Sequence, residues 1–193
     1  MENFIRQYYV EDLQQCKKAI EWFEDNTERG GPGRFLYTGE NSARASDNEL
    51  KESYDMSVDF QELYNVPCFA HILDCLWNSV LKYAEEFEEV NYTDFSLLEE
   101  INLQRYEPPT GGFKVFHNER GCMTTANRFL VWMIYLNTVT DKGGTEFKYL
   151  DHTEDAVEGK IIIWPTDFTH THRGVVSPTQ KKYILTGWYS FYK

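Results

Sequence analysis

The sequence predicts a mostly β protein with supporting α-helices: a double-sheet jelly-roll core, with amino-terminal helices packed on one sheet. Two observations predict it. Residues 1–100 contain two amphipathic segments whose apolar residues recur at intervals of three and four, the period of a helix. Residues 101–193 contain about seven short β-rich runs separated by turns of Gly, Pro and Asp. No repeat and no long linker interrupts the chain, so we expect one domain over 1–193.

The first half of the chain is expected to be largely helical. A helix over 10–26 should end near Thr27, because three glycines and a proline follow at 30–33. A longer amphipathic helix is expected over 67–90. Its apolar face needs a sheet to lie on, and that face consists of Phe69, Ile72, Leu73, Leu76, Trp77, Val80, Leu81, Ala84 and Phe87.

The second half of the chain is expected to supply the strands. Each run is short, and the turns between runs suit a jelly roll built from two sheets. The runs are INLQRYE (101–107), GFKVFH (112–117), NRFLVWMIYLN (127–137), TEFKYL (145–150), GKIIIWP (159–165), THTHRGV (169–175) and KKYILTGWYSFY (181–192).

The composition narrows the function classes. A formal net charge of −12 argues against general affinity for nucleic-acid backbones or anionic membranes. It is compatible with a basic protein partner, although acidity is also a common solubility device. The start of the chain lacks the apolar run of a signal peptide, and no stretch is apolar enough to span a bilayer. The four cysteines show no CxxC spacing, so we expect reduced thiols in a cytoplasmic protein.

His117, Glu119 and His172 could hold one metal ion. Alternate residues of a strand point to the same side, so His117 and Glu119 can face the interior together. Two imidazoles and one carboxylate on one face of an iron(II) ion leave neighbouring positions open for other ligands. A lone His-x-Glu is a weak signal, and an isolated histidine on a strand is more often structural. The residues around the triad therefore decide its interpretation.

Further residues accompany the triad at defined places. They are Tyr106 upstream of His117, Tyr135 in YLN, the glycine pair 143–144 in DKGGTEF, Gly174, Lys182 ten residues after His172, and Trp188. Together these residues resemble the iron- and 2-oxoglutarate-dependent dioxygenases, specifically their prolyl 4-hydroxylase branch. The resemblance covers 101–193; over 1–100 only the order of helices before a barrel is similar.

The resemblance implies a double-stranded β-helix of the cupin type, with His117, Glu119 and His172 as iron ligands. The carboxylate ligand of this branch is usually aspartate, so Glu119 is a departure that could alter iron affinity or geometry. A retained carboxylate nevertheless favours hydroxylation over halogenation. His170 is an alternative to His172. The His-x-Gly pattern and the step to Lys182 select His172 and leave His170 to line the pocket.

The resemblance also implies a site for 2-oxoglutarate. Lys182, assisted by Thr186, matches the residue that binds its distal carboxylate. The hydroxyls of Tyr106 and Tyr135 match groups that reach the co-substrate, and Trp188 matches an aromatic residue of the active-site wall. Tyr135 and Trp188 fit ordinary core aromatics equally well. Lys182 is harder to dismiss, because a buried lysine needs an anionic partner.

The implied activity is oxidation of 2-oxoglutarate by O2 to succinate and CO2, coupled to hydroxylation of a C–H bond, with Fe(II) as cofactor and ascorbate as a candidate reductant. The first hypothesis is 4-hydroxylation of a prolyl residue in a peptide or protein, and a basic substrate would suit the net charge. The alternatives are an oxygenase of a free amino acid or other small metabolite, and a non-catalytic jelly-roll binding module. A nucleic-acid demethylase is disfavoured, because the sequence shows no basic patch with interleaved aromatics.

The polar segment 38–58 lies where related enzymes carry a mobile loop over a peptide substrate. Its mixed charges fit such a lid, and a plain surface connection fits equally. Arg44 and Tyr54 are its candidate substrate contacts. Arg120, next to Glu119, is a further candidate, with a surface salt bridge as the alternative. The sequence leaves the substrate and the oligomeric state open.

Overall fold

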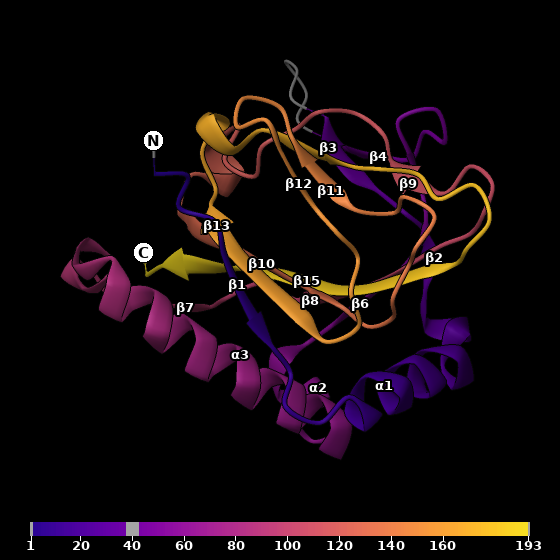
Figure 1. Cartoon of the computed structure of the whole chain (residues 1–193), viewed down its shortest axis with the longest axis horizontal. Helices are drawn as coiled ribbons and strands as arrows, with labels where there is room; N and C mark the ends of the chain where they lie inside the picture. The colour runs from indigo at the N-terminus through magenta and orange to yellow at the C-terminus, as the bar shows by residue number, and fades with distance from the viewer. Residues whose placement is uncertain (1, 38–42, 193) are drawn as a thin grey trace.

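The computed structural model describes residues 2–37 and 43–192, and its centre is a large, mostly antiparallel sheet (Figure 1). In these residues the sheet has eight strands in the order β1-β13-β10-β15-β8-β6-β2, and β7 also pairs with β15. The strands are β1 (Arg6–Tyr9), β2 (Gly31–Pro32), β6 (Tyr54–Val58), β7 (Phe95–Leu97), β8 (Ile101–Tyr106), β10 (Arg128–Tyr135), β13 (Lys160–Pro165) and β15 (Lys182–Phe191).

A smaller sheet faces the large one and closes the jelly roll. It has the order β12-β11-β14, with β11 (Thr145–Phe147) between β12 (His152–Glu154) and β14 (His172–Gly174). Two short pairs lie beside it, and they are β3 (Phe35–Tyr37) with β4 (Ala43–Ala45), and β5 (Lys51–Glu52) with β9 (Gly112–Phe113). The predicted double-stranded β-helix, mostly β with supporting helices, is confirmed.

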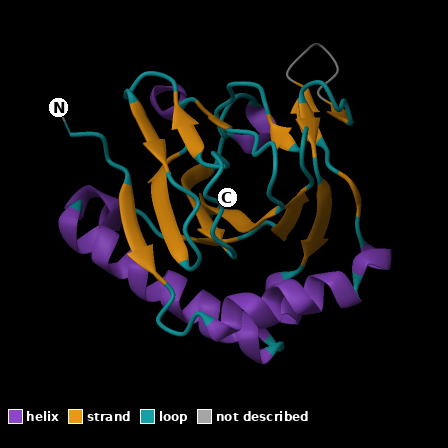
Figure 2. Cartoon of the chain, turned by 45° about the vertical axis from the view of Figure 1, so that its right-hand side comes forward, coloured by secondary structure: helices purple, strands orange, loops and turns teal. Residues whose placement is uncertain are grey.

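The helices cover the outer face of the large sheet (Figure 2). They are α1 (Gln14–Asp25), α2 (Phe60–Tyr64) and α3 (Pro67–Glu86). A 3-10 turn follows α1 at Thr27–Arg29, and another follows α3 at Glu88–Tyr92. Pro67 begins α3, where its missing N–H costs no helical hydrogen bond. Both predicted helices are confirmed, each a few residues shorter than expected. No helix in the described ranges is long and apolar enough to cross a membrane.

Strand alternation divides the core into two layers. On β10, Leu130, Trp132 and Ile134 belong to the apolar cluster between the large sheet and the helices. The alternate residues Val131, Met133 and Tyr135 belong to a second cluster between the two sheets. Because both faces of β10 are covered, the strand reads as a continuous apolar run. The second cluster fills only part of the space between the sheets, and the remainder forms a cavity.

The candidate lid over 38–58 is wrong for its last five residues. Residues 54–58 form β6, which pairs with β8 inside the large sheet. Met56 and Val58 are buried toward the helices, so β6 is held by packing as well as by backbone hydrogen bonds. Residues 38–42 lie outside the described residues, and 43–45 form β4.

We expect Leu76→Ala to lower the free energy of unfolding by about 2–5 kcal/mol, because Leu76 is 0% exposed between α3 and the sheet. Leu81→Ala on the same helix is the matched control, since Leu81 is 45% exposed and its loss should change stability by less than about 0.5 kcal/mol. Urea denaturation followed by circular dichroism measures both. Equal losses would contradict the packing of α3 on the sheet.

Candidate metal centre and co-substrate pocket

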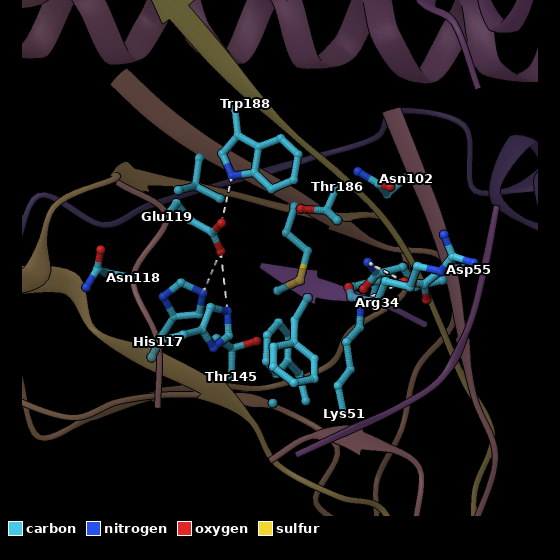
Figure 3. Close-up of a pocket in the computed structure, with 18 of the residues that line it drawn as sticks. Arg34, Lys51, Asp55, Asn102, His117, Asn118, Glu119, Thr145, Thr186 and Trp188 are labelled. Atoms are coloured by element: carbon cyan, nitrogen blue, oxygen red, sulfur yellow. Dashed lines mark hydrogen bonds and ion pairs between the residues drawn. The ribbon is translucent and has the colours of Figure 1, made fainter. Parts of the chain in front are cut away.

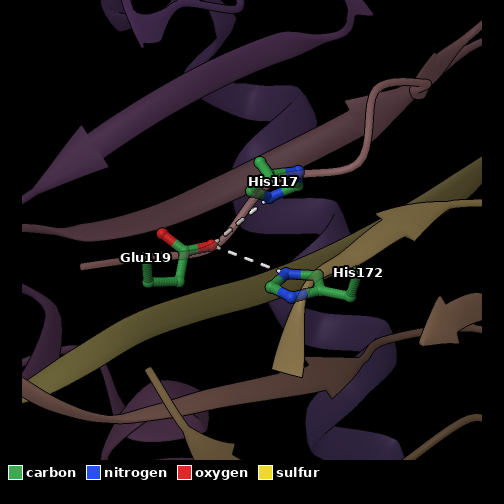
Figure 4. A group of neighbouring side chains, drawn as sticks. All are labelled: His117, Glu119 and His172. Atoms are coloured by element: carbon green, nitrogen blue, oxygen red, sulfur yellow. Dashed lines mark ion pairs between the residues drawn. The ribbon is translucent and has the colours of Figure 1, made fainter. Parts of the chain in front are cut away.

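Backbone pairing brings the predicted metal ligands together. The amide N–H of His117 donates to the carbonyl of His172, and that of His172 donates to the carbonyl of His117, each at 2.9 Å. Glu119 is anchored separately, because its amide N–H donates to Thr166 at 3.1 Å. The three side chains converge (Figure 4), although one histidine follows β9 and the other begins β14.

The donor atoms have the spacing that a shared metal ion requires. The Oε1 atom of Glu119 lies 3.3 Å from Nε2 of His117 and 3.5 Å from Nε2 of His172. All three donor atoms lie within 4.8 Å of one another. Ligand atoms bound at about 2 Å on one face of an octahedral ion lie about 3 Å apart, which is close to the two separations from Glu119. The set is therefore a candidate site for one ion.

The tautomers of both imidazoles also suit a metal ion. The Nδ1 atom of His117 lies 3.0 Å from the carbonyl oxygen of Val115, and that of His172 lies 2.9 Å from the carbonyl oxygen of His170. A carbonyl only accepts, so each Nδ1 carries the proton and donates it. Each Nε2 therefore keeps its lone pair and points it toward Glu119, the arrangement found in metal-binding histidines.

The electrostatics of the triad favour its metal-binding forms. Burial alone would raise the pKa of Glu119, but in the metal-free protein hydrogen bonds and charge from His117 and His172, when their imidazoles are protonated, hold that pKa well below its usual range. Burial lowers the pKa of His172, which keeps its imidazole neutral. A carboxylate and neutral imidazoles are the forms that bind cations.

The other carboxylate oxygen of Glu119 is held by two residues from the large sheet. Trp188 donates its indole N–H to Oε2 at 3.0 Å, and Arg128 donates from Nη1 at 3.3 Å. Trp188 was predicted to belong to the active-site wall, whereas Arg128 was not predicted. The available signal was an arginine at the start of an otherwise apolar strand, since buried arginines are rare without partners.

Lys182 is the other charged group deep in this region. Its ammonium is 4% exposed, donates to the carbonyl of Gly143 at 2.8 Å, and lies 4.8 Å from the centre of the Tyr106 ring. Burial lowers its pKa to about 8. Among the described residues no carboxylate pairs with it. An unpaired buried cation is costly, so this position suits an anionic ligand.

A cavity of about 650 Å³ between the two sheets connects these groups. In Figure 3 His117 and Glu119 lie on one side of it, and Arg34, Lys51 and Asp55 lie on the opposite side. The latter three residues were not predicted. Nothing in their polar sequence context distinguished them from surface residues.

Two residues predicted to bind the co-substrate are tied to the protein. Thr186 lines the cavity, but its hydroxyl donates to the carbonyl of Trp132 at 2.8 Å. The hydroxyl of Tyr135 bonds to that of Thr145 at 2.7 Å. Tyr135 is fully buried and does not line the cavity, whereas Thr145 does. Tyr135 therefore reaches the cavity only through Thr145.

The predicted substrate contacts lie away from the cavity. His170 is not on a strand beside His172 but ends a 3-10 turn, Phe168–His170, and its Nε2 bonds to the carbonyl of Asn3 at 2.8 Å. Arg120 forms the alternative salt bridge, with Asp167, at 2.7 Å.

Of the two candidates from the polar segment, Tyr54 is also absent from the cavity lining. Tyr54 donates its hydroxyl to the carbonyl of Thr27 and packs on Phe23 on the helical side of the sheet. Arg44 lies on β4 opposite Leu36, and its side chain falls outside the part of the chain that is described.

Comparison with known proteins agrees with this geometry. Residues 101–190 match the model of the 2OG-Fe(II) oxygenase superfamily. This part of the chain is therefore similar to a 2OG-Fe(II) oxygenase domain. No curated protein matches the chain in sequence.

Solved structures of similar fold include several prolyl hydroxylases. The viral collagen prolyl hydroxylase of Paramecium bursaria Chlorella virus-1, as its 2-oxoglutarate complex, is 12% identical with a TM-score of 0.67, covering 98% of this chain and 97% of that one. A Pseudomonas putida prolyl-4-hydroxylase is 14% identical with a TM-score of 0.69, covering 97% and 93%. A Trichoplax adhaerens prolyl hydroxylase, in complex with a peptide of hypoxia inducible factor, is 13% identical with a TM-score of 0.73, covering 98% and 84%. At these identities the likeness shows the shared fold.

We expect His172→Ala to abolish binding of Co(II) or Fe(II) at concentrations that saturate the unaltered protein, because one of three donors is removed. His170→Ala is the control, since its imidazole contacts Asn3 instead. Anaerobic titration followed by optical absorption measures both. Loss of the metal in His170→Ala alone would reassign the ligand.

Proposed function

We propose that the protein is an Fe(II)- and 2-oxoglutarate-dependent dioxygenase that hydroxylates prolyl residues, at the 4-position, in a peptide or protein. The observation that carries this proposal is the pairing, in one cavity, of a His-Glu-His donor set with a buried cation that has no carboxylate partner among the described residues. The donor set suits iron, and the cation suits an acidic co-substrate. Together they support the use of 2-oxoglutarate and O2 with release of succinate and CO2.

Each residue of the site has a distinct task in this proposal. His117, Glu119 and His172 would hold Fe(II), which supplies the oxygen activation and redox chemistry of the reaction when it is bound. Lys182 binds the distal carboxylate of 2-oxoglutarate, and the Tyr106 ring beneath it fixes the position of the ammonium group.

The rest of the cavity orients substrate and excludes water. Val131, Met133 and Ile184 line it with apolar side chains that belong to the buried core between the sheets. Apolar walls of this kind keep bulk water from the reacting C–H bond and strengthen the electrostatic contacts of the co-substrate. Arg128 faces the same cavity, but its donors are already engaged by Glu99 and Glu119.

The far side of the cavity supports a peptide substrate over a free amino acid. Lys51 donates to Oδ2 of Asp55 at 2.6 Å, which balances the carboxylate charge. The other oxygen of Asp55 is buried without a hydrogen-bond partner in the described residues. A charge-balanced acceptor suits the neutral N–H of a peptide bond better than an ammonium group, whose charge would stay uncompensated. A peptide also lies in the similar Trichoplax enzyme.

The deciding experiment incubates the oxygenase with Fe(II), 2-oxoglutarate and ascorbate, with proline-containing peptides and free amino acids offered in parallel. We expect succinate formation and a gain of one oxygen on proline in a peptide, detected by mass spectrometry. Glu119→Ala is the inactive control. Oxygen gain on a free amino acid alone would favour the small-metabolite alternative. Absence of succinate with every substrate would support a binding module.

We expect Lys182→Met to raise the KM for 2-oxoglutarate about ten- to a hundredfold, because a charge-assisted contact of about 1.5–3 kcal/mol is lost. Methionine keeps the apolar stem, so the free energy of unfolding should not fall. Lys181→Met, at the exposed neighbouring position paired with Glu107, is the matched control and should leave KM unchanged. Equal KM values for both variants would remove Lys182 from the co-substrate site.

We expect the affinity for 2-oxoglutarate to fall as pH rises through about 8, the lowered pKa of Lys182, because the neutral amine no longer attracts a carboxylate. Stability should change in the opposite direction. The unfolded lysine stays protonated above this pH while the buried one does not, so deprotonation relieves a burial cost. Anaerobic calorimetry with Mn(II) measures affinity and thermal unfolding measures stability. A pH-independent affinity across this range would contradict the role of Lys182.

A further inference from the structure

We propose that Arg128 and Trp188 form a carboxylate clamp, which fixes Oε2 of Glu119 so that Oε1 alone is offered to the metal ion. The clamp residues are placed to hold a glutamate carboxylate, and the shorter aspartate would not reach them. This inference rests on the metal centre proposed above. Both residues line the cavity, and in this proposal they act as positioning residues for Glu119.

The clamp contacts both the side chain and the main chain of Glu119. The Oε2 atom accepts the indole N–H of Trp188 at 3.0 Å and Nη1–H of Arg128 at 3.3 Å. The same Nη1 also donates to the backbone carbonyl of Glu119 at 3.3 Å. One guanidinium nitrogen therefore positions both the main chain and the side chain of this residue.

The clamp is itself rigid. The Nε and Nη2 atoms of Arg128 donate to the two carboxylate oxygens of Glu99 at 2.7 and 2.6 Å. The guanidinium lies 3.5 Å from the centre of the Trp188 ring, and the Arg128 side chain is 10% exposed. Arg128 begins β10 and Trp188 lies on the neighbouring β15. The clamp thus ties the segment carrying Glu119 to the large sheet.

The division of the two oxygens has a chemical consequence. A carboxylate whose second oxygen accepts two hydrogen bonds cannot turn that oxygen toward a metal ion without losing both. Oε1 faces both imidazoles, so the clamp selects one donor atom per ligand. The single charge of Arg128 is shared between Glu99 and Glu119, so negative charge remains at the triad to attract a cation.

The glutamate side chain at position 119 is long enough to reach both the clamp residues and the two imidazoles. Aspartate is shorter by one carbon–carbon bond, about 1.5 Å. Withdrawing the carboxylate by that amount would carry Oε2 beyond hydrogen-bonding distance of Trp188 and Arg128, or carry Oε1 away from the imidazoles. Aspartate is the usual carboxylate ligand in the prolyl 4-hydroxylase branch that this chain resembles. Here a longer glutamate is combined with a clamp that holds its second oxygen.

The test uses Co(II) alone as the probe, titrated anaerobically into the complete protein and followed by its optical spectrum. We expect Trp188→Phe, which keeps the ring under Arg128 and removes the N–H, to weaken Co(II) binding about ten- to a hundredfold and to change the spectrum. Trp132→Phe is the matched control. Its buried indole N–H has no partner in the described residues and lies on the helical face, so Co(II) affinity should be unchanged.

The Glu119→Asp variant tests whether Trp188 affects metal binding through its contact with Glu119 or only by supporting the fold. We expect it to bind Co(II) more weakly than the unaltered protein, and we expect Trp188→Phe to add little in the Glu119→Asp background, because the contact is already lost. Tighter binding by Glu119→Asp, or unchanged affinity and spectrum in Trp188→Phe, would overturn the clamp. If His172→Ala binds Co(II) as the unaltered protein does, the metal centre itself fails.

Discussion

The backbone bridge between His117 and His172 is the constraint on which the site depends. Two mutual hydrogen bonds of 2.9 Å join segments that are far apart in the chain. They set the separation of the two imidazoles before any metal ion binds, and the Nδ1 contacts to backbone carbonyls set their rotation. Backbone atoms supply the partners of these hydrogen bonds, and the two rings also pack on Phe113 and Trp164. The carboxylate of Glu119 is instead held by hydrogen bonds from other side chains.

Most of the buried charged side chains that line the cavity have a partner of opposite charge. Asp55 is paired with Lys51, and Arg128 is shared between Glu99 and Glu119. These pairs satisfy the requirement that a buried charge has a partner. Lys182 is the exception among the buried cations that line the cavity in the described residues, with a backbone carbonyl as its hydrogen-bond acceptor. Because the other buried cations of the cavity are paired and this one has only a neutral acceptor, the position suits an anionic ligand. The electrostatics of the cavity and the resemblance to known oxygenases therefore both support an acidic co-substrate.

The sequence held enough to predict the jelly roll, the covering helices and the ligand spacing, because each rests on local periodicity or on i, i+2 geometry. His170 was misplaced since a 3-10 turn ends there, and a turn breaks strand alternation. Strand β6 was missed although Met56 and Val58 alternate with polar residues, because its inner face lines a polar cavity and reads as a surface loop. Arg128 could not be assigned, because its partners come from three different segments.

Burial of Lys182 links stability to co-substrate binding. Its lowered pKa means that the charged form is disfavoured in the free protein, so the fold carries a cost at neutral pH. A carboxylate beside the ammonium removes that cost in addition to forming its own contact. The co-substrate should therefore bind more tightly than an exposed lysine would permit, and should stabilise the fold by mass action. If the proposed site is correct, the burial cost of the Lys182 ammonium in the free protein therefore favours binding of an acidic ligand.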